Sequence, residues 1–154
     1  MSSDFLEYAQ ERELAFLLVD AGRKLNDACD IEMKPLSLTR SQWRVIAYIS
    51  RSPGISQTEL AASVECSRMA ITSLLRRMQS KDLIERHGSA TDRRIRTVHL
   101  TAKGRSLVKR MNKIAIGVLE TLFTGISRKE LQSMQQALER IKLNAATVTQ
   151  IDSK

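Results

Sequence analysis

Short signals for the start of a helix recur along this chain, and they constrain its fold more than any other feature. At 39–42, 56–59 and 127–130 a Ser or Thr is followed three residues later by Gln or Glu, the pattern of a capping box. Apolar residues flank each box, as Leu38 and Trp43 do around the first. A further cap is expected at Ser67. The chain is therefore predicted to be a series of separately started helices.

Turn residues and apolar spacing give the lengths of these helices. One helix is predicted from 39 to about 51, where Ser52-Pro53-Gly54 ends it, and the next from 56 to about 62. The helix that follows Ser67 would bury Ile71, Leu74, Leu75 and Met78. Two short helices joined by about four residues predict a helix-turn-helix. An earlier helix, ending near Pro35, is marked by apolar residues at Leu14, Leu18, Ala21, Leu25 and Ala28.

Two β-prone runs, at 83–87 and 95–100, flank a polar loop that begins with Gly88. They predict a β-hairpin directly after the helix-turn-helix, which is the position of a wing. The fold class is therefore predicted to be mainly α with a small β-hairpin wing.

Positive charge is concentrated in the middle of the chain. The 154 residues carry a formal net charge of +8, yet 36–110 holds 15 Lys and Arg against 5 Asp and Glu, a net +10. The rest of the chain is slightly acidic. This distribution predicts a protein that neutralises phosphates. The alternative is a generally basic surface that serves solubility.

The helix after Ser67 is predicted to present small hydroxyl groups and arginines, without an acid, opposite its apolar side. Such a face suits a major groove, where Ser and Thr approach base edges and Arg reaches guanine or phosphate. An ordinary basic surface helix is the alternative. The candidate contacts are Ser67, Arg68, Ala70, Thr72, Ser73, Arg76 and Arg77.

The predicted wing adds Arg93, Arg94 and Arg96, which are expected to follow a phosphate backbone or enter a minor groove. Asp92 stands among them as an orienting partner for an arginine, as a turn residue, or as both.

The two ends of the chain supply long amphipathic helices. One is expected from Thr101 to about 125, and the last carries an apolar seam at heptad-like spacing at Leu131, Met134, Leu138, Ile141, Ala145 and Val148. Packing against an identical partner in a two-fold dimer is the predicted use of these helices, and an intramolecular three-helix bundle is the alternative.

Several of these segments resemble the multiple antibiotic resistance regulator (MarR) family. They are Leu38–Val45, Ser56–Ala61, the wing that ends Asp92-Arg93-Arg94, and Leu100-Thr101-Ala102-Lys103-Gly104. The resemblance implies a single domain, 1–154, that forms a dimer of winged helix-turn-helix subunits. The lobe that binds DNA would span 36–104, with dimerisation arms at 1–34 and 105–154.

By the same resemblance the chain is a transcriptional regulator that binds a pseudo-palindromic operator on double-stranded DNA and usually represses. Arg94 corresponds to the family's wing arginine and Asp92 to its acidic partner, while Ser56 and Gln57 would offer a helix N-terminus to phosphate. Ser73 stands where several relatives have a basic residue, so operator preference does not transfer. An activating or anti-silencing regulator, a winged-helix module that binds protein instead of DNA, and a thiol-based redox-sensing repressor remain alternatives.

The resemblance also implies release from DNA by a small aromatic or phenolic ligand that binds between the arms and the lobe. Arg23 and Arg44 are the candidate partners of its carboxylate. The apolar candidates are equally explained as core packing, and they are Leu25, Cys29, Trp43, Ile46 and Met111.

Other functions have little support in the sequence. The two cysteines, Cys29 and Cys66, form no Cys-x-x-Cys motif, so no metal or other cofactor is expected. His87 and His99 lie on one small hairpin without a catalytic series, so no enzyme is expected. No apolar run approaches the roughly 20 residues that span a bilayer, and a cytoplasmic protein is predicted.

Overall fold

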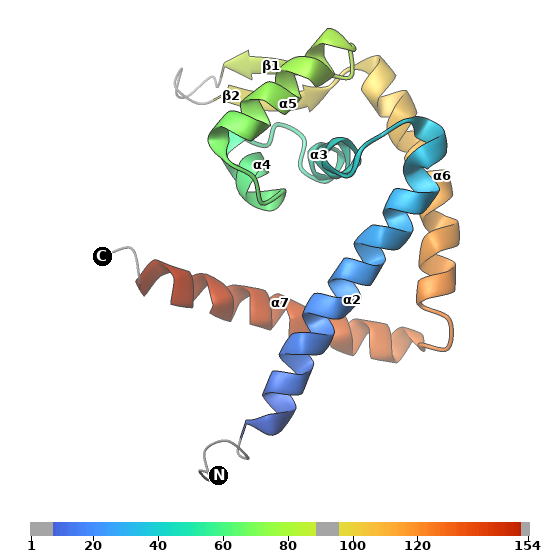
Figure 1. Ribbon diagram of the computed structural model, residues 1–154, viewed down its shortest axis with the longest axis vertical. Helices are drawn as coiled ribbons and strands as arrows, with labels where there is room; N and C mark the ends of the chain where they lie inside the picture. The colour runs from blue at the N-terminus through green and yellow to red at the C-terminus, as the bar shows by residue number, and fades with distance from the viewer. Residues whose placement is uncertain (1–7, 89–95, 152–154) are drawn as a thin grey trace. The chain divides into compact units, whose positions relative to one another are not determined.

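The computed structural model describes residues 8–88 and 96–151. It divides into two compact units, 1–119 and 120–154, which are considered separately. Its elements (Figure 1) are α2 (Ala9–Met33), the 3-10 helix η1 (Lys34–Leu36), α3 (Arg40–Arg51), α4 (Gln57–Ser63), α5 (Arg68–Ser80), β1 (Ile84–Gly88), β2 (Arg96–Leu100), α6 (Ala102–Leu122) and α7 (Arg128–Ile151). A mainly α fold with a small β-hairpin, as predicted, is confirmed.

The predicted helix starts are confirmed by their hydrogen bonds. At α3 the Gln42 backbone N–H donates to the Thr39 hydroxyl (3.4 Å), and the Thr39 N–H donates to Gln42 Oε1 (3.0 Å). Ser56 with Glu59 and Ser127 with Glu130 close the same box before α4 and α7. Hydrogen bonds from the Ser56 hydroxyl and backbone hold the pKa of Glu59 below its ordinary value. Each box satisfies backbone donors that a helix start leaves unpaired.

The core of the first unit lies among α3, α4, α5 and the hairpin, which Figure 1 shows gathered together. α5 packs against α4 and β1, while α3 packs against β2. The four apolar residues predicted to face inward from α5 are all buried there. The side chains with almost no exposed surface are Ile46, Ile49, Leu60, Ile71, Leu75, Met78, Ile84, Val45 and Val98.

The hairpin is antiparallel, with Ile84 opposite Leu100 and Gly88 opposite Arg96. Its second strand is also tied to the residues before α4, because the Val98 N–H donates to the Ile55 carbonyl at 3.0 Å. The hairpin is therefore held next to the N-terminus of α4.

The start of α6 gives a physical reason for the Leu-Thr-x-x-Gly motif. The Thr101 hydroxyl accepts from the Gly104 N–H (3.0 Å) and donates to the Asp82 carbonyl (2.7 Å). The Thr101 N–H donates to the Leu83 carbonyl at 3.2 Å. A Cβ on Gly104 would lie 2.1 Å from that same carbonyl oxygen. Threonine thus caps α6 on the turn before β1, and only glycine permits the close approach.

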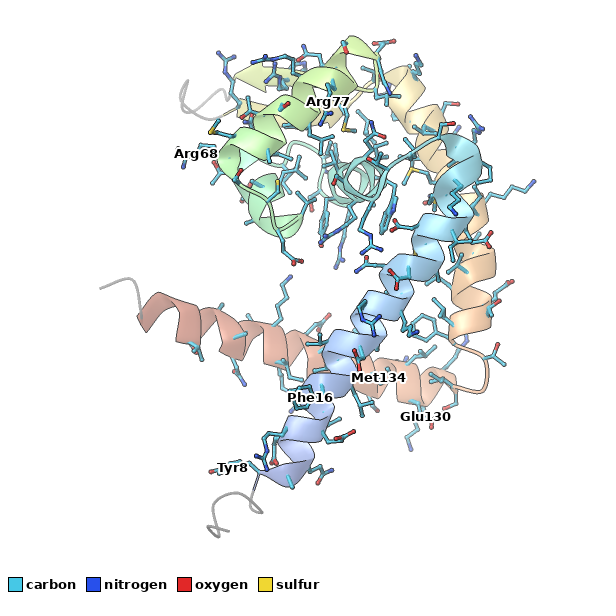
Figure 2. The ribbon with its side chains drawn as sticks, viewed as in Figure 1. Tyr8, Phe16, Arg68, Arg77, Glu130 and Met134 are labelled. Atoms are coloured by element: carbon cyan, nitrogen blue, oxygen red, sulfur yellow. The ribbon has the colours of Figure 1, made fainter. Side chains whose placement is uncertain are left out.

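The long helices expose much of their apolar surface. On α2, Phe16 and Val19 are each 70% exposed, and Figure 2 labels Phe16 on this helix and Tyr8 just before it. In the second unit, α7 exposes Met134, Leu138 and Ile141. The predicted helices are confirmed, and their pairing in a dimer stays a prediction. Among the helices described, none combines the length and apolar character that crossing a membrane requires.

Candidate nucleic-acid interface

α5 has two sharply different sides. Its buried side is apolar, and its opposite side carries the predicted contacts Arg68, Ala70, Ser73, Arg76 and Arg77, all of which are exposed. Figure 2 labels Arg68 near the start of this helix and Arg77 toward its end. Because the whole helix carries no acidic residue, this side has a uniformly positive charge.

The arginines of this side have no acidic partner among residues 8–88 and 96–151. Elsewhere in the same unit, Arg40 and Arg44 are both engaged in ion pairs. Arg68, Arg76 and Arg77 form no such pair within those ranges. Their guanidinium groups are therefore available to an external anion.

Two of the predicted contacts join α4 to α5. Gln57 Nε2 donates to the Thr72 hydroxyl at 2.6 Å, and that hydroxyl donates to the Arg68 carbonyl at 2.7 Å. Thr72 is half-buried as a result. Its hydroxyl therefore bridges the two helices, and its predicted contact with DNA stays a prediction.

Ser56 and Ser67 act as helix caps in the structure. The Ser67 hydroxyl accepts from the Ala70 N–H at 3.2 Å. The Ser56 N–H donates to Glu59 Oε2 at 3.0 Å, so this N–H is already bonded within the capping box. Any phosphate contact from the start of α4 would have to use other groups than this amide.

The described part of the wing places Arg96 on its exposed end. Arg96 lines a cavity of about 350 Å³ together with Gln79 and Arg86. Arg86 Nε donates to Gln79 Oε1 at 2.9 Å, which ties β1 to the end of α5. The predicted contacts Asp92, Arg93 and Arg94 lie outside the described residues.

A concave surface brings four predicted contacts together. It is an open cavity of about 650 Å³ between α4, the start of α5 and the wing. Two arginines from different elements, Arg68 and Arg96, contribute to its lining. The complete lining is Ser56, Gln57, Thr58, Ala61, Ala62, Cys66, Arg68 and Arg96. Residues far apart in the sequence therefore share one concave surface that carries two arginines.

The predicted ligand-binding residues are mostly committed to other contacts. Ile46 is fully buried and Met111 is 5% exposed, so both are core residues. Arg44 donates to the Ser63 carbonyl (3.1 Å) and to Glu65 Oε1 (3.1 Å), which binds it to the end of α4. Arg23 pairs with Asp20 on the surface of α2.

The remaining ligand candidates are Leu25, Cys29 and Trp43. Leu25 is 38% exposed, while Cys29 and Trp43 are half-buried. None of the three lines the cavity between α4, α5 and the wing. The predicted ligand residues therefore divide into buried ones, ones bonded to other groups, and partly accessible ones.

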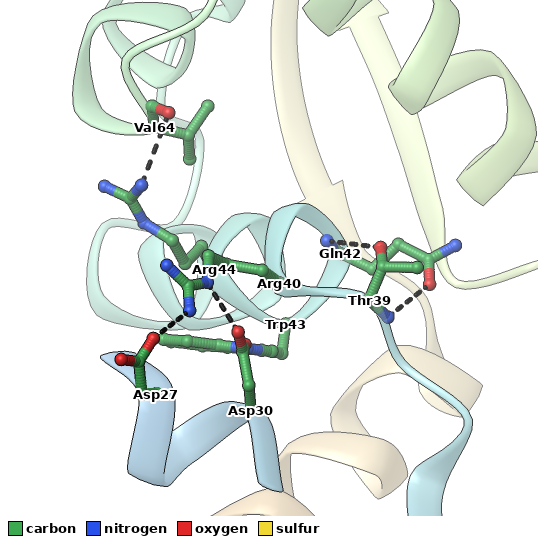
Figure 3. A network of polar contacts seen from close by, with 8 residues as sticks. All are labelled: Asp27, Asp30, Thr39, Arg40, Gln42, Trp43, Arg44 and Val64. Carbon is green, nitrogen blue, oxygen red and sulfur yellow. Dashed lines mark hydrogen bonds and ion pairs between the residues drawn. The ribbon is translucent and has the colours of Figure 1, made fainter. Parts of the chain in front are cut away.

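A polar network connects α2 to α3 (Figure 3), and sequence reasoning missed it. Arg40 donates to Asp27 at 2.7 Å and to Asp30 at 2.5 Å, and Trp43 Nε1 donates to the other oxygen of Asp30 at 2.7 Å. The hydrogen bond to Asp27, together with the one to Asp30, raises the pKa of Arg40 above its ordinary value. The network holds the last turns of α2 against the lobe.

We expect Asp30→Ala to destabilise the protein by about 1–3 kcal/mol, because it leaves the half-buried Trp43 N–H without its acceptor. Asp20→Ala is the matched control, since Asp20 pairs with Arg23 on the exposed surface of the same helix and such pairs contribute about 0–1 kcal/mol. Urea denaturation measures both. Equal free energies of unfolding for the two variants would contradict a structural role for the network.

Cys29 and the two histidines of the hairpin have defined surroundings in the described residues. Burial, with a contribution from Asp30, raises the pKa of the Cys29 thiol above its ordinary value, which disfavours the thiolate that oxidants attack. His87 and His99 stack with ring centroids 4.9 Å apart on the hairpin. No group of three or more His, Cys, Asp or Glu in the described ranges is arranged to hold a metal ion.

The sequence of this chain is similar to those of known transcription regulators. Residues 36–95 match the sequence model of the MarR family. The chain is 26% identical over 133 residues to the HTH-type transcriptional repressor Rv2887 of Mycobacterium tuberculosis, which covers 86% of this chain and 96% of that protein. The resemblance to the MarR family is confirmed.

Solved structures show the same fold. The transcriptional repressor CouR bound to a 23-mer DNA duplex aligns with a TM-score of 0.69 at 26% identity, over 88% of this chain and 96% of that chain. A MarR-family transcriptional regulator from Silicibacter pomeroyi aligns with a TM-score of 0.78 at 22% identity, over 90% and 94%. This chain has the fold of MarR-family transcription regulators, which are not enzymes.

Proposed function

We propose that this chain is a homodimeric, sequence-specific DNA-binding protein that represses transcription from a pseudo-palindromic operator. The observation that carries the proposal is the exposed side of α5, where Arg68, Arg76 and Arg77 have no acidic partner in the described ranges. CouR, a repressor of similar fold, is bound to DNA in its own structure, which supports the same use here. Repression is preferred to activation because Rv2887 is a repressor.

The arrangement of the lobe suits this role. In a helix-turn-helix the second helix enters the major groove, and its first residues contact base edges. α5 is that helix, and its start carries Arg68 beside the cavity that also includes Arg96 of the wing. With α5 in the major groove, the wing would lie against the adjacent backbone or minor groove. Arg93 and Arg94 would extend this contact.

The dimer is proposed from the exposed apolar residues of the arms, 1–34 and 105–154, outside the lobe at 36–104. Phe16 and Val19 of α2, Ile116 of α6 and Leu143 of α7 are each more than half exposed. Apolar surface on this scale marks an interaction site. A second copy of the chain would cover it and would place two α5 helices on one face of a duplex.

Release by a small aromatic or phenolic ligand belongs to the proposal as its regulatory part. Such a ligand acts only if it prefers a state in which α5 is misplaced, because equal affinity for two states shifts nothing. The contact of Arg40, Asp30 and Trp43 joins α2 to the lobe, so it is the contact that such a state would have to alter. Leu25 and Cys29, the two predicted ligand residues on this helix that are apolar, are both at least partly accessible.

Selection of bound duplexes from a randomised library tests the proposal. We expect an inverted repeat whose half-sites are about 10 base pairs apart from centre to centre, since two α5 helices of a two-fold dimer reach successive major grooves. Light scattering on the same preparation should give twice the 17.4 kDa chain mass. Recovery of no common sequence would contradict specific reading, and a single unrepeated half-site with a monomeric mass would contradict the dimer.

A further inference from the structure

Met69 is an anomaly in the DNA-binding lobe. Its side chain is 85% exposed, more than any other large hydrophobic residue in the described ranges. The other strongly exposed ones lie on α2 or just before it, on α6 and the turn after it, or on α7. Between α3 and β2, every large apolar side chain that the structure describes is at least partly buried except this one.

The place of Met69 on α5 is specific. Met69 is the second residue of the helix, and it stands four residues before Ser73 and seven before Arg76, a spacing that puts all three on one side. At roughly 100° per residue, Met69 lies about 170° away from the middle of the buried stripe. It therefore points outward at the N-terminal end of the helix, between Arg68 and Ala70.

We propose that Met69 recognises thymine by contacting its C5-methyl group in the major groove. This inference rests on the proposed DNA binding and adds a specificity-determining residue to it. The first residues of a recognition helix are those that reach base edges. The thymine methyl is the one apolar group that a base pair presents in this groove. An unbranched, polarizable thioether adapts to such a group without demanding a fixed geometry.

The side chains next to Met69 cannot recognise the thymine methyl group themselves. Arg68 and Arg76 offer charge for phosphate or guanine, and Ser73 offers a hydroxyl, so none of them distinguishes thymine from uracil. The Ser67 hydroxyl is bonded to the Ala70 N–H. Met69 is the only side chain on this face of α5 with an extended apolar surface.

The test replaces thymine by deoxyuridine, one position at a time, in the duplex recovered by selection. This substitution removes only the C5-methyl group. For the unmodified protein we expect one position in each half-site where binding weakens about fourfold, the effect of losing one buried methyl contact. Replacing both symmetric positions should weaken binding about 15-fold, because well-separated positions act roughly additively. Fluorescence anisotropy gives the dissociation constants.

Two variants assign this effect to Met69. Met69→Ala should bind more weakly and should no longer distinguish thymine from deoxyuridine at that position, while Met69→Leu should retain the distinction. Both variants should unfold at the temperature of the original protein, since the side chain is 85% exposed. If Met69→Ala keeps the full response to deoxyuridine, or no position responds, the inference is wrong and the proposed function stands. If the unmodified protein selects no sequence, both are wrong.

Discussion

Replacing Arg76 and Arg77 together by alanine is expected to weaken specific DNA binding by about 100-fold or more, because a dimer loses four groups that face the duplex. Both residues are exposed on α5 and lack an acidic partner among the described residues, so their loss removes no internal contact that is known. If all four contact phosphates, the slope of log K against log salt should also fall by about 3.6. Anisotropy titrations at several salt concentrations measure both quantities.

Lys109 and Arg110 supply the matched control. They are adjacent, exposed and basic like Arg76 and Arg77, but they lie on α6. Their double replacement by alanine lowers the net charge by the same amount, and it should change affinity by no more than about threefold, as expected for remote charges in salt. Equal losses for the two double variants would show that total charge, and not the face of α5, governs binding.

Gly104→Ala is expected to reduce the free energy of unfolding by about 3 kcal/mol, at the upper end of the cost of forcing an extra methyl group into a packed site. Its Cβ would lie 2.1 Å from the Leu83 carbonyl oxygen and 3.2 Å from Leu100 Cδ2. The carbonyl is not free to move away, because it accepts the Thr101 N–H at 3.2 Å. The start of α6 must therefore separate from the turn before β1.

Gly117→Ala on the same helix is the control. A Cβ at Gly117 meets no atom within 4 Å, so alanine should stabilise the helix by roughly 0.5–1 kcal/mol through its higher helix propensity. Opposite signs for the two variants in urea denaturation are the expected outcome. A Gly104→Ala protein as stable as the original would show that Thr101 and Gly104 do not form a rigid junction.

Local signals were enough to predict most of the fold. The boxes at Thr39, Ser56 and Ser127 involve residues three apart, and each formed at the predicted place. The inward side of α5 followed from apolar spacing alone. Capping boxes and helix faces depend on residues close together in the sequence, so both can be predicted without knowing the tertiary structure.

The polar contacts between elements could not be predicted in this way. Arg40 meets Asp27, 13 residues earlier, and Arg44 reaches Glu65, 21 residues later. The hydrogen bond between Thr72 and Gln57 of the preceding helix was likewise not predicted. Which residues become partners depends on how the helices pack against one another, and the spacing of residues within one helix does not give that. Arg44 was therefore assigned to a ligand, although the end of α4 occupies it.

Met69 was missed for a different reason. The predicted buried set of α5 and its predicted contact set both left this residue out, because the contact set was limited to small and basic residues. Its spacing of four from Ser73 and seven from Arg76 would have placed it on the outer side. Position on the helix, and not residue type, carries that information.

The most direct test of the central claim, that the exposed side of α5 reads a DNA sequence, is a competition titration. A fluorescent duplex that carries the selected inverted repeat is titrated with the protein at several salt concentrations, with and without excess random duplex. We predict nanomolar-range binding that survives the competitor and whose logarithm falls linearly with the logarithm of the salt concentration. Binding that the random duplex abolishes would contradict the claim and would leave a basic winged helix without sequence preference.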